Sequence, residues 1–145
     1  MCSSDLEQIL AWYAQIHGII PTCLRYFNAS GASAERGEHH RVETHLIPNV
    51  LLTALGQRPQ VDIFGDRHAT PDGTCIRDYI HVRDLASAHI LALHRDKAGF
   101  FNVGTGNGHS VQQVVEAAKR VTKKNIPVRM QPARAGDPQI GRAHV

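Results

Sequence analysis

The sequence has few of the features that mark membrane, secreted or nucleic-acid-binding proteins. No apolar run approaches the roughly 20 residues that a membrane-spanning helix requires, and the N-terminus does not show the charged-then-apolar order of a signal peptide. The net charge is +3, but the basic residues are scattered and form no run that would follow a nucleic-acid backbone. These absences favour a cytoplasmic protein without a membrane or nucleic-acid partner, and they leave anionic small molecules open as ligands.

Cysteine is also scarce. Cys2, Cys23 and Cys75 are odd in number and show no Cys-x-x-Cys spacing, which argues against a disulfide framework and against a zinc site. We expect reduced thiols that are mostly buried. With 145 residues, of which 42% are hydrophobic and 20% charged, the chain fits one globular unit or a part of a larger domain.

The two ends of the chain are related through the genetic code. Residues 139–143 can be encoded by CAG ATC GGA AGA GCA, whose reverse complement encodes residues 2–6. The agreement extends one codon further, because CAC for His144 reverses to GTG, an alternative start codon that is read as Met1. The string also resembles a common sequencing adapter. We therefore expect residues 1–6 and 139–145 to be non-native, adapter-derived sequence that flanks a native segment of residues 7–138.

Between these ends, helical and strand patterns alternate. Apolar residues at helical spacing predict a helix at 6–17, and the apolar run at 19–27 predicts a strand that is buried on both faces. Residues 28–41 show no period and are predicted to form a loop at the carboxyl end of that strand, where open α/β sheets bind ligands. The further expected elements are a helix at 46–55, strands at 61–64 and 77–81, a helix at 84–93, a strand at 100–103, a helix at 110–121 capped by Ser110, and a strand at 128–130. This order predicts a parallel α/β sheet.

The glycine-rich segment from Gly104 to His109 lies between a predicted strand and a predicted helix, which is the setting of a phosphate-binding loop. The spacing does not fit that function, because His109 stands where the fingerprint requires glycine. About 20 positions further on, where an acidic residue is expected, the chain has Lys123 and Lys124. We interpret the segment as a structural turn.

Histidines also gather in the loop that precedes the helix at 46–55. His39, His40 and His45 are close in sequence, but adjacent histidines point in different directions and no fixed spacing with carboxylates accompanies them. We expect solvated loop residues here, and we assign no metal site to the chain.

Arg77 and Arg134 lie in turns near predicted strand ends. A guanidinium group is planar and permanently charged, so two of them suit the two phosphates of a diphosphate. Ion pairing with the neighbouring Asp78 and Asp137 is the alternative. The residue pattern leaves both interpretations open.

Successive segments of the chain resemble the signatures of the UDP-glucose 4-epimerases, which are extended short-chain dehydrogenases. Their order and spacing match throughout the segments 24–28, 44–48, 63–65, 70–82, 84–86, 101–106, 110–111 and 134–138. Related extended short-chain dehydrogenases share the Arg-Tyr-Phe-Asn and Arg-Asp-Tyr strings. The longer Thr-Pro-Asp-Gly-Thr insertion before Arg77 favours the 4-epimerase branch.

The resemblance implies an α/β fold that comprises the C-terminal part of a Rossmann-like doubly wound domain and a small substrate-binding α/β region. It implies NAD as the cofactor, with Tyr26 and Phe27 beside the nicotinamide. The implied contacts of the UDP-sugar diphosphate come from Asn28, Thr44, His45, Leu46 and Arg77. In addition, Phe64 would border the uracil, Tyr79 would support the site, Arg134 would neutralise phosphate and Asp137 would accept a ribose hydroxyl.

The implied activity is the interconversion of UDP-glucose and UDP-galactose through a 4-keto intermediate, a step of galactose metabolism. In the family, the Tyr-x-x-x-Lys motif and the Gly-rich cofactor loop lie upstream of the part that this chain matches. We therefore expect this chain to lack the catalytic residues and to be inactive alone. Tyr13 is no substitute, because His17 stands four positions later where lysine is required.

Two alternatives remain open at this point. The chain could be a fragment of another sugar-nucleotide epimerase or dehydratase, or a non-catalytic module that binds a nucleotide sugar. Full-length members of the family commonly form homodimers. Without parallel neighbours for the strand at 19–27, we expect this chain alone to aggregate or to be partly disordered.

Overall fold

The computed structural model describes residues 3–136 and 138–141, and it has the alternation of helices and strands that the sequence predicts. The elements in chain order are α1 (Ser3–His17), β1 (Thr22–Tyr26), β2 (Asn28–Ser30), α2 (Leu46–Ala54), β3 (Val61–Phe64), β4 (Ile76–His81), α3 (Val82–Leu93), β5 (Gly99–Val103), β6 (Gly108–Ser110), α4 (Val111–Thr122), β7 (Val128–Gln131) and β8 (Ile140–Gly141). In the described part of the chain, no helix is both long and apolar enough to cross a membrane.

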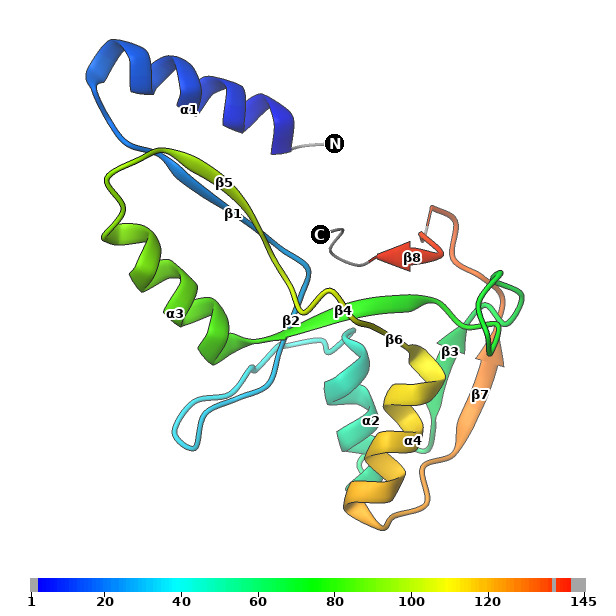
Figure 1. The fold of residues 1–145 in the computed structure, drawn as a ribbon. Coiled ribbons are helices and arrows are strands. Elements are labelled where there is room, and N and C mark those ends of the chain that lie inside the picture. Colours follow the sequence, from blue (N-terminus) through cyan, green and yellow to red (C-terminus); the bar gives the residue numbers. More distant parts are fainter. Residues whose placement is uncertain (1–2, 137, 142–145) are drawn as a thin grey trace.

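Strand β4 connects the two halves of the molecule. It pairs in parallel with β2 and β8 and antiparallel with β6, whereas the pairs β1–β5 and β3–β7 are parallel. Figure 1 shows β4 crossing the middle of the molecule, with α1, β1, β5 and α3 on one side and α2, α4, β3 and β7 on the other. The prediction of an α/β fold with parallel strands is confirmed, and β6 adds an antiparallel neighbour.

The buried core lies in the half built from α2, β3, α4 and β7. Its apolar members come from two helices, a strand and a loop: Val50, Val61, Ile63, Val115 and Ile126. Helix α4 begins with a full capping box, because the Ser110 hydroxyl accepts from the Gln113 N–H while the Gln113 side chain accepts from the Ser110 N–H. The expected N-cap role of Ser110 is confirmed.

The other half has little buried apolar surface. The strand expected at 19–27 is shorter, and the prediction that both of its faces are buried is wrong, because Ile20 and Tyr26 are each about half exposed. Within the described residues, β1 pairs only with β5. An apolar run indicates that a strand prefers burial, but whether the strand is buried depends on which elements pack against it.

Three short strands were not predicted. Asn28–Ser30, expected to be loop, forms β2, while Gly108–Ser110 forms β6 and Ile140–Gly141 forms β8. All three pair with β4, so the partner strand and not their own periodicity determines their conformation. The adapter origin of residues 1–6 and 139–145 stays a prediction.

The insertion before β4 is built as a set of internal hydrogen bonds. One carboxylate oxygen of Asp72 accepts from the Thr74 N–H at 2.9 Å and the Thr74 hydroxyl at 2.7 Å, and the other accepts from the Ser110 hydroxyl. Burial alone raises the pKa of the Asp72 carboxyl, but these hydrogen bonds outweigh it and the net pKa is lowered. The insertion therefore anchors the start of α4.

Gly73 has no room for a side chain at the centre of this insertion. Its φ is +77°, and a Cβ atom would lie 2.2 Å from the carbonyl oxygen of Asp66. Gly56 also has a positive φ, +73°, but nothing lies within 4 Å of its Cβ position. Both glycines therefore need a positive φ, but only Gly73 also lacks space for a Cβ atom.

We predict that Gly73→Ala lowers the free energy of unfolding by more than Gly56→Ala does. Each alanine carries backbone strain of about 1 to 2 kcal/mol, and only the alanine at Gly73 adds a clash with backbone. Urea-induced unfolding, followed by far-UV circular dichroism at low protein concentration, measures both variants. Equal losses would show that the insertion relaxes around a methyl group.

We also predict that the 145-residue chain self-associates in solution. Helix α1 exposes Trp12 and Ile16, and α3 exposes Leu91 and Leu93, at 54 to 83% of their surface. Exposed apolar surface of this extent favours association. Sedimentation velocity over a range of concentrations tests this, and a monomer that melts cooperatively would contradict it.

Candidate functional site

The first group of candidate site residues lies where β1 runs into β2. Tyr26 ends β1 with its ring centroid 6.3 Å from that of His89, and it is 52% exposed. Phe27 links the two strands and Asn28 begins β2. The Asn28 amide nitrogen donates to the backbone carbonyl of Asp78 at 3.1 Å. These residues therefore lie at the carboxyl end of a parallel strand, as expected for a ligand site.

The second group lies on β4, next to β2. Tyr79 is the register partner of Asn28, so these two candidates are neighbours across the sheet. Arg77 and Tyr79 alternate with Asp78 and therefore share one face of β4. Burial raises the pKa of Tyr79 to about 12, so its hydroxyl keeps its proton even in alkaline solution.

Arg77 is held against its own strand. Its guanidinium donates to the carbonyl oxygen of Ile76 at 2.8 Å, and its side chain packs against Gly141, where a Cβ atom would lie 3.3 Å from the arginine Cδ. The side chain is partly buried. This packing limits the conformations of the side chain and places its positive charge near the start of β4.

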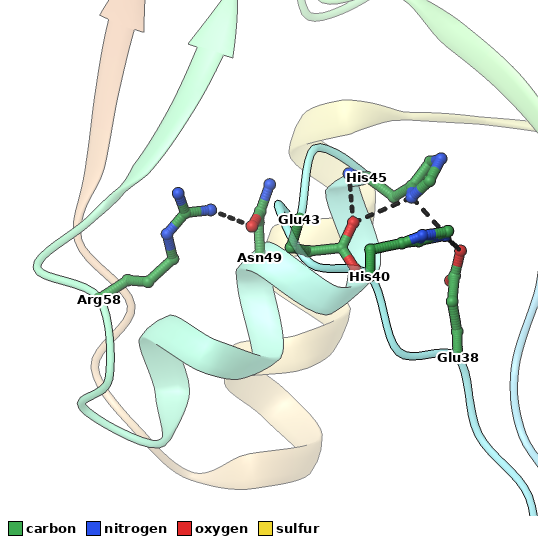
Figure 2. Close-up of polar contacts among 6 residues, drawn as sticks. All are labelled: Glu38, His40, Glu43, His45, Asn49 and Arg58. Atoms are coloured by element: carbon green, nitrogen blue, oxygen red, sulfur yellow. Dashed lines mark hydrogen bonds and ion pairs between the residues drawn. The ribbon is translucent and has the colours of Figure 1, made fainter.

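The third group precedes α2. His45 occupies the N-cap position but makes no side-chain cap bond. Instead, Glu43 accepts from the His45 N–H at 2.7 Å and contacts its Nδ1 at 2.9 Å (Figure 2). The hydrogen bond from the His45 backbone is the main reason that the pKa of Glu43 is lowered. Thr44 is exposed, and Leu46 begins the helix and packs against the core.

The fourth group lies at the ends of β3 and β7. The Arg134 guanidinium stacks on the Phe64 ring, with its central carbon 3.7 Å from the ring centroid. A surface hollow next to Phe64 is lined by Gly65, His68, Gln131 and other residues of the two following loops. Asp137, the remaining candidate, lies outside the described residues.

The structure thus joins some candidates and leaves others apart. Contacts or strand register connect Asn28 with Tyr79 and Phe64 with Arg134. The residues Thr44, His45 and Leu46 are grouped by their place at the start of α2. The roles assigned to all these residues stay predictions.

The backbone amides of the glycine-rich turn are hydrogen-bonded to a side chain of the protein itself. Asp78 is fully buried, and its carboxylate accepts from the Thr105 N–H at 3.0 Å, the Thr105 hydroxyl at 2.7 Å and the Gly106 N–H at 2.9 Å. These amides are the groups that a phosphate-binding loop would offer to its ligand. A protein carboxylate takes that position here, which supports the interpretation of the segment as a structural turn.

From the sequence, Asp78 was considered only as an ion-pair partner of Arg77, and its contact with the glycine-rich turn was not predicted. A signal was available, since Ile76, Asp78 and Ile80 occupy alternate positions and point to the same face of β4. A carboxylate between two isoleucines on an inward face requires buried donors. The glycine-rich turn offered such donors, because no partner had been predicted for its backbone amides.

Comparison with known proteins identifies the relatives of this chain. A model of the NAD dependent epimerase/dehydratase family matches residues 5–104. The UDP-glucose 4-epimerase of Corynebacterium glutamicum is 51% identical over 137 residues, a match that covers 92% of this chain and 42% of that protein.

Solved structures show the same likeness. The crystal structure of UDP-glucose 4-epimerase from Brucella ovis in complex with NAD superposes with a TM-score of 0.87 at 47% identity, and covers 95% of this chain and 44% of that one. The enzyme from Bifidobacterium longum in complex with NAD+ and UDP gives a TM-score of 0.86 at 39% identity, over 95% of this chain and 43% of that one. The chain therefore spans less than half the length of the relatives it matches.

We predict that Asp78→Asn destabilises the chain and loosens the glycine-rich turn. Asparagine replaces one of the two carboxylate oxygens with an NH₂ group, which then faces the donor or donors that this oxygen accepted from. An unsatisfied buried group costs about 1 to 3 kcal/mol. Hydrogen exchange should accelerate at the Thr105 and Gly106 amides. The Gln113 amide, which the Ser110 hydroxyl binds, is the internal control and should change only as far as global stability does. Unchanged exchange at Thr105 and Gly106 would mean that Asp78 does not hold the turn.

Proposed function

Because the chain belongs to the NAD dependent epimerase/dehydratase family, we propose that it forms the substrate-side portion of a UDP-sugar 4-epimerase that interconverts UDP-glucose and UDP-galactose. In fold terms, this is the C-terminal part of a Rossmann-like doubly wound domain with its small substrate-binding region. The observation that carries the proposal is the 51% identity to UDP-glucose 4-epimerases over 92% of the chain. We further propose that the protein is cytoplasmic and that the full-length form is a homodimer.

In this proposal, Tyr26 and Phe27 border the nicotinamide of NAD. The residues fit that function, because an aromatic ring that is 52% exposed at the carboxyl end of a parallel strand offers a flat apolar surface to a planar ligand. The cofactor supplies reversible hydride transfer at the sugar C4 when it is bound. The residues of this chain position the sugar nucleotide and leave the hydride chemistry to the cofactor.

The diphosphate is bound by side chains of this chain. Arg77 on β4 and Arg134 after β7 supply two permanent positive charges whose planar forks match phosphate oxygens. Asn28 orients its amide through the bond to the Asp78 carbonyl, which leaves its amide oxygen available as an acceptor for a sugar hydroxyl. The amides at Thr105 and Gly106 are already bound by Asp78, so they do not contribute to phosphate binding.

The nucleobase is assigned to Phe64. Arg134 covers one face of this ring at 3.7 Å, so the edge and the opposite face remain for uracil. The same arrangement holds the Arg134 fork close to where the base meets the ribose and the phosphates. Thr44 and His45, exposed at the start of α2, complete the proposed site on the sugar side, and Asp137 is proposed to accept a ribose hydroxyl.

We predict that Arg77→Ala lowers kcat/KM for UDP-galactose by about 10- to 100-fold, since a hydrogen bond to a charged group contributes about 1.5 to 3 kcal/mol. The assay measures interconversion of UDP-galactose and UDP-glucose by the enzyme expressed from the full reading frame that encodes this chain. Arg120→Ala is the matched control, because Arg120 is exposed in the last turn of α4.

Three outcomes separate the alternatives. Loss of activity in Arg77→Ala with Arg120→Ala unaffected supports the epimerase and the diphosphate contact. An enzyme that turns over a different sugar nucleotide would move the assignment to another epimerase or a dehydratase. Binding of a UDP-sugar without turnover would indicate a non-catalytic module.

A further inference from the structure

The loop between β2 and α2 gathers imidazole and carboxylate groups at one place. The ligand atoms of Glu38, His40 and His45 all lie within 4.8 Å of one another, and Glu43 adds a second carboxylate beside His45 (Figure 2). We propose that these four residues form a binding site for a divalent transition-metal ion of the zinc class. This site goes beyond the proposed function and does not depend on it.

The carboxylate of Glu38 lies between the two imidazole rings. Its Oε1 is 2.6 Å from His40 Nε2 and 3.4 Å from His45 Nδ1. The two rings are tilted by 47° with their centroids 4.8 Å apart, so both present a nitrogen to the same oxygen. Convergence of two imidazoles and a carboxylate on one point is the arrangement that a first coordination shell requires.

The Nδ1 atom of His45 contacts two carboxylates but can donate only one proton. This atom contacts Glu38 Oε1 at 3.4 Å and Glu43 Oε1 at 2.9 Å, and one ring proton cannot satisfy both carboxylates well. A cation at the same place satisfies both, together with the lone pair of the deprotonated ring nitrogen. Glu43 is the least exposed of the four side chains, at 13%, and its carboxylate is held in place because it accepts from the backbone N–H of His45.

The distances lie close to those of a bound ion. Zinc–nitrogen and zinc–oxygen bonds of about 2.0 to 2.2 Å in a tetrahedron place ligand atoms about 3.3 to 3.5 Å apart. The 3.4 Å separation of His45 Nδ1 and Glu38 Oε1 has this value. The 2.6 Å separation of His40 Nε2 and Glu38 Oε1 is shorter, and all the ligand atoms lie within 4.8 Å of one another. Side chains that are 39 to 57% exposed can make that adjustment by rotation.

The ligand types indicate the class of ion. Two imidazole nitrogens disfavour Ca²⁺ and Mg²⁺, which take oxygen ligands. Imidazole and carboxylate together suit Zn²⁺ and its neighbours in the transition series. From the sequence, no metal site was expected here, because adjacent histidines point in different directions. That argument applies to His39 and His40, whereas the fold brings His45 back to His40.

Such an ion would act as a clip on the chain. Residues 31–45 contain no helix or strand, and the side chain of His45, at the N-cap of α2, makes no capping bond. A metal bonded to both His40 and His45 would fix the path of this loop into the helix. The residues proposed to contact the sugar would then be held by the same ion.

Binding of Zn²⁺ alone tests the proposal on the 145-residue chain, by competition with a chromophoric zinc indicator at pH 7.5. We expect the parent chain to bind one Zn²⁺ ion at this cluster, and we expect His40→Ala and Glu38→Gln each to weaken that affinity at least about tenfold. His39→Ala is the matched control, because His39 belongs to the same exposed loop and is not a member of the cluster. Its affinity should stay within about twofold of the parent.

A second measurement distinguishes zinc bound at this histidine cluster from zinc bound by cysteine thiols and from effects of self-association. Zn²⁺ should protect His40 and His45, but not His39, from modification by diethyl pyrocarbonate, read residue by residue in a mass spectrometer. Protection of His40 and His45 alone supports the site. Equal protection of all three, or equal effects of His39→Ala and His40→Ala on affinity, overturns it.

Discussion

The buried carboxylate of Asp78 is the contact on which the arrangement of the two halves depends. Strand β4 pairs with β2, β6 and β8, and Asp78 reaches from it to the amides of Thr105 and Gly106. Those amides lie between β5, which belongs to one half, and β6 and α4, which lead into the other (Figure 1). One buried carboxylate, which accepts hydrogen bonds from Thr105 and Gly106, thereby sets where the chain crosses between the halves.

This constraint also determines how an anion can be bound. A glycine-rich turn before a helix normally offers its backbone donors to phosphate, but here the protein supplies the anion itself. Asp72 fulfils a similar function at the start of α4, where it accepts from the Ser110 hydroxyl. With these donors occupied, side-chain cations are the groups left for a diphosphate. In the proposed site, Arg77 and Arg134 therefore supply charge as well as position.

The sequence predicted what has its own periodicity and missed what depends on a partner. The long helices and the strands at 61–64 and 128–130 were found because their apolar residues repeat at the period of the element. The three-residue strands β2 and β6 carry no such pattern, and their hydrogen-bond partners on β4 determine their conformation. The same distinction explains the His40–His45 pair, because loop paths follow no period and bring residues together only in three dimensions.

The stacked pair of Arg134 and Phe64 illustrates how weak contacts can prepare a binding site. A cation–π contact at an exposed position contributes only about 0.5 to 1 kcal/mol, too little to matter for the stability of the fold. It does restrict a long side chain that otherwise samples many rotamers, and that restriction would lower the entropy lost in the phosphate contact proposed for this guanidinium. The pairing of β3 with β7 brings Phe64 opposite Gln131, and Arg134 lies in the loop that follows β7. The sheet therefore determines where the two residues lie, and the stacking restricts the direction of the guanidinium. A ligand that brings both a planar base and a phosphate meets both groups in place, whereas a ligand with only one of them gains from only one contact.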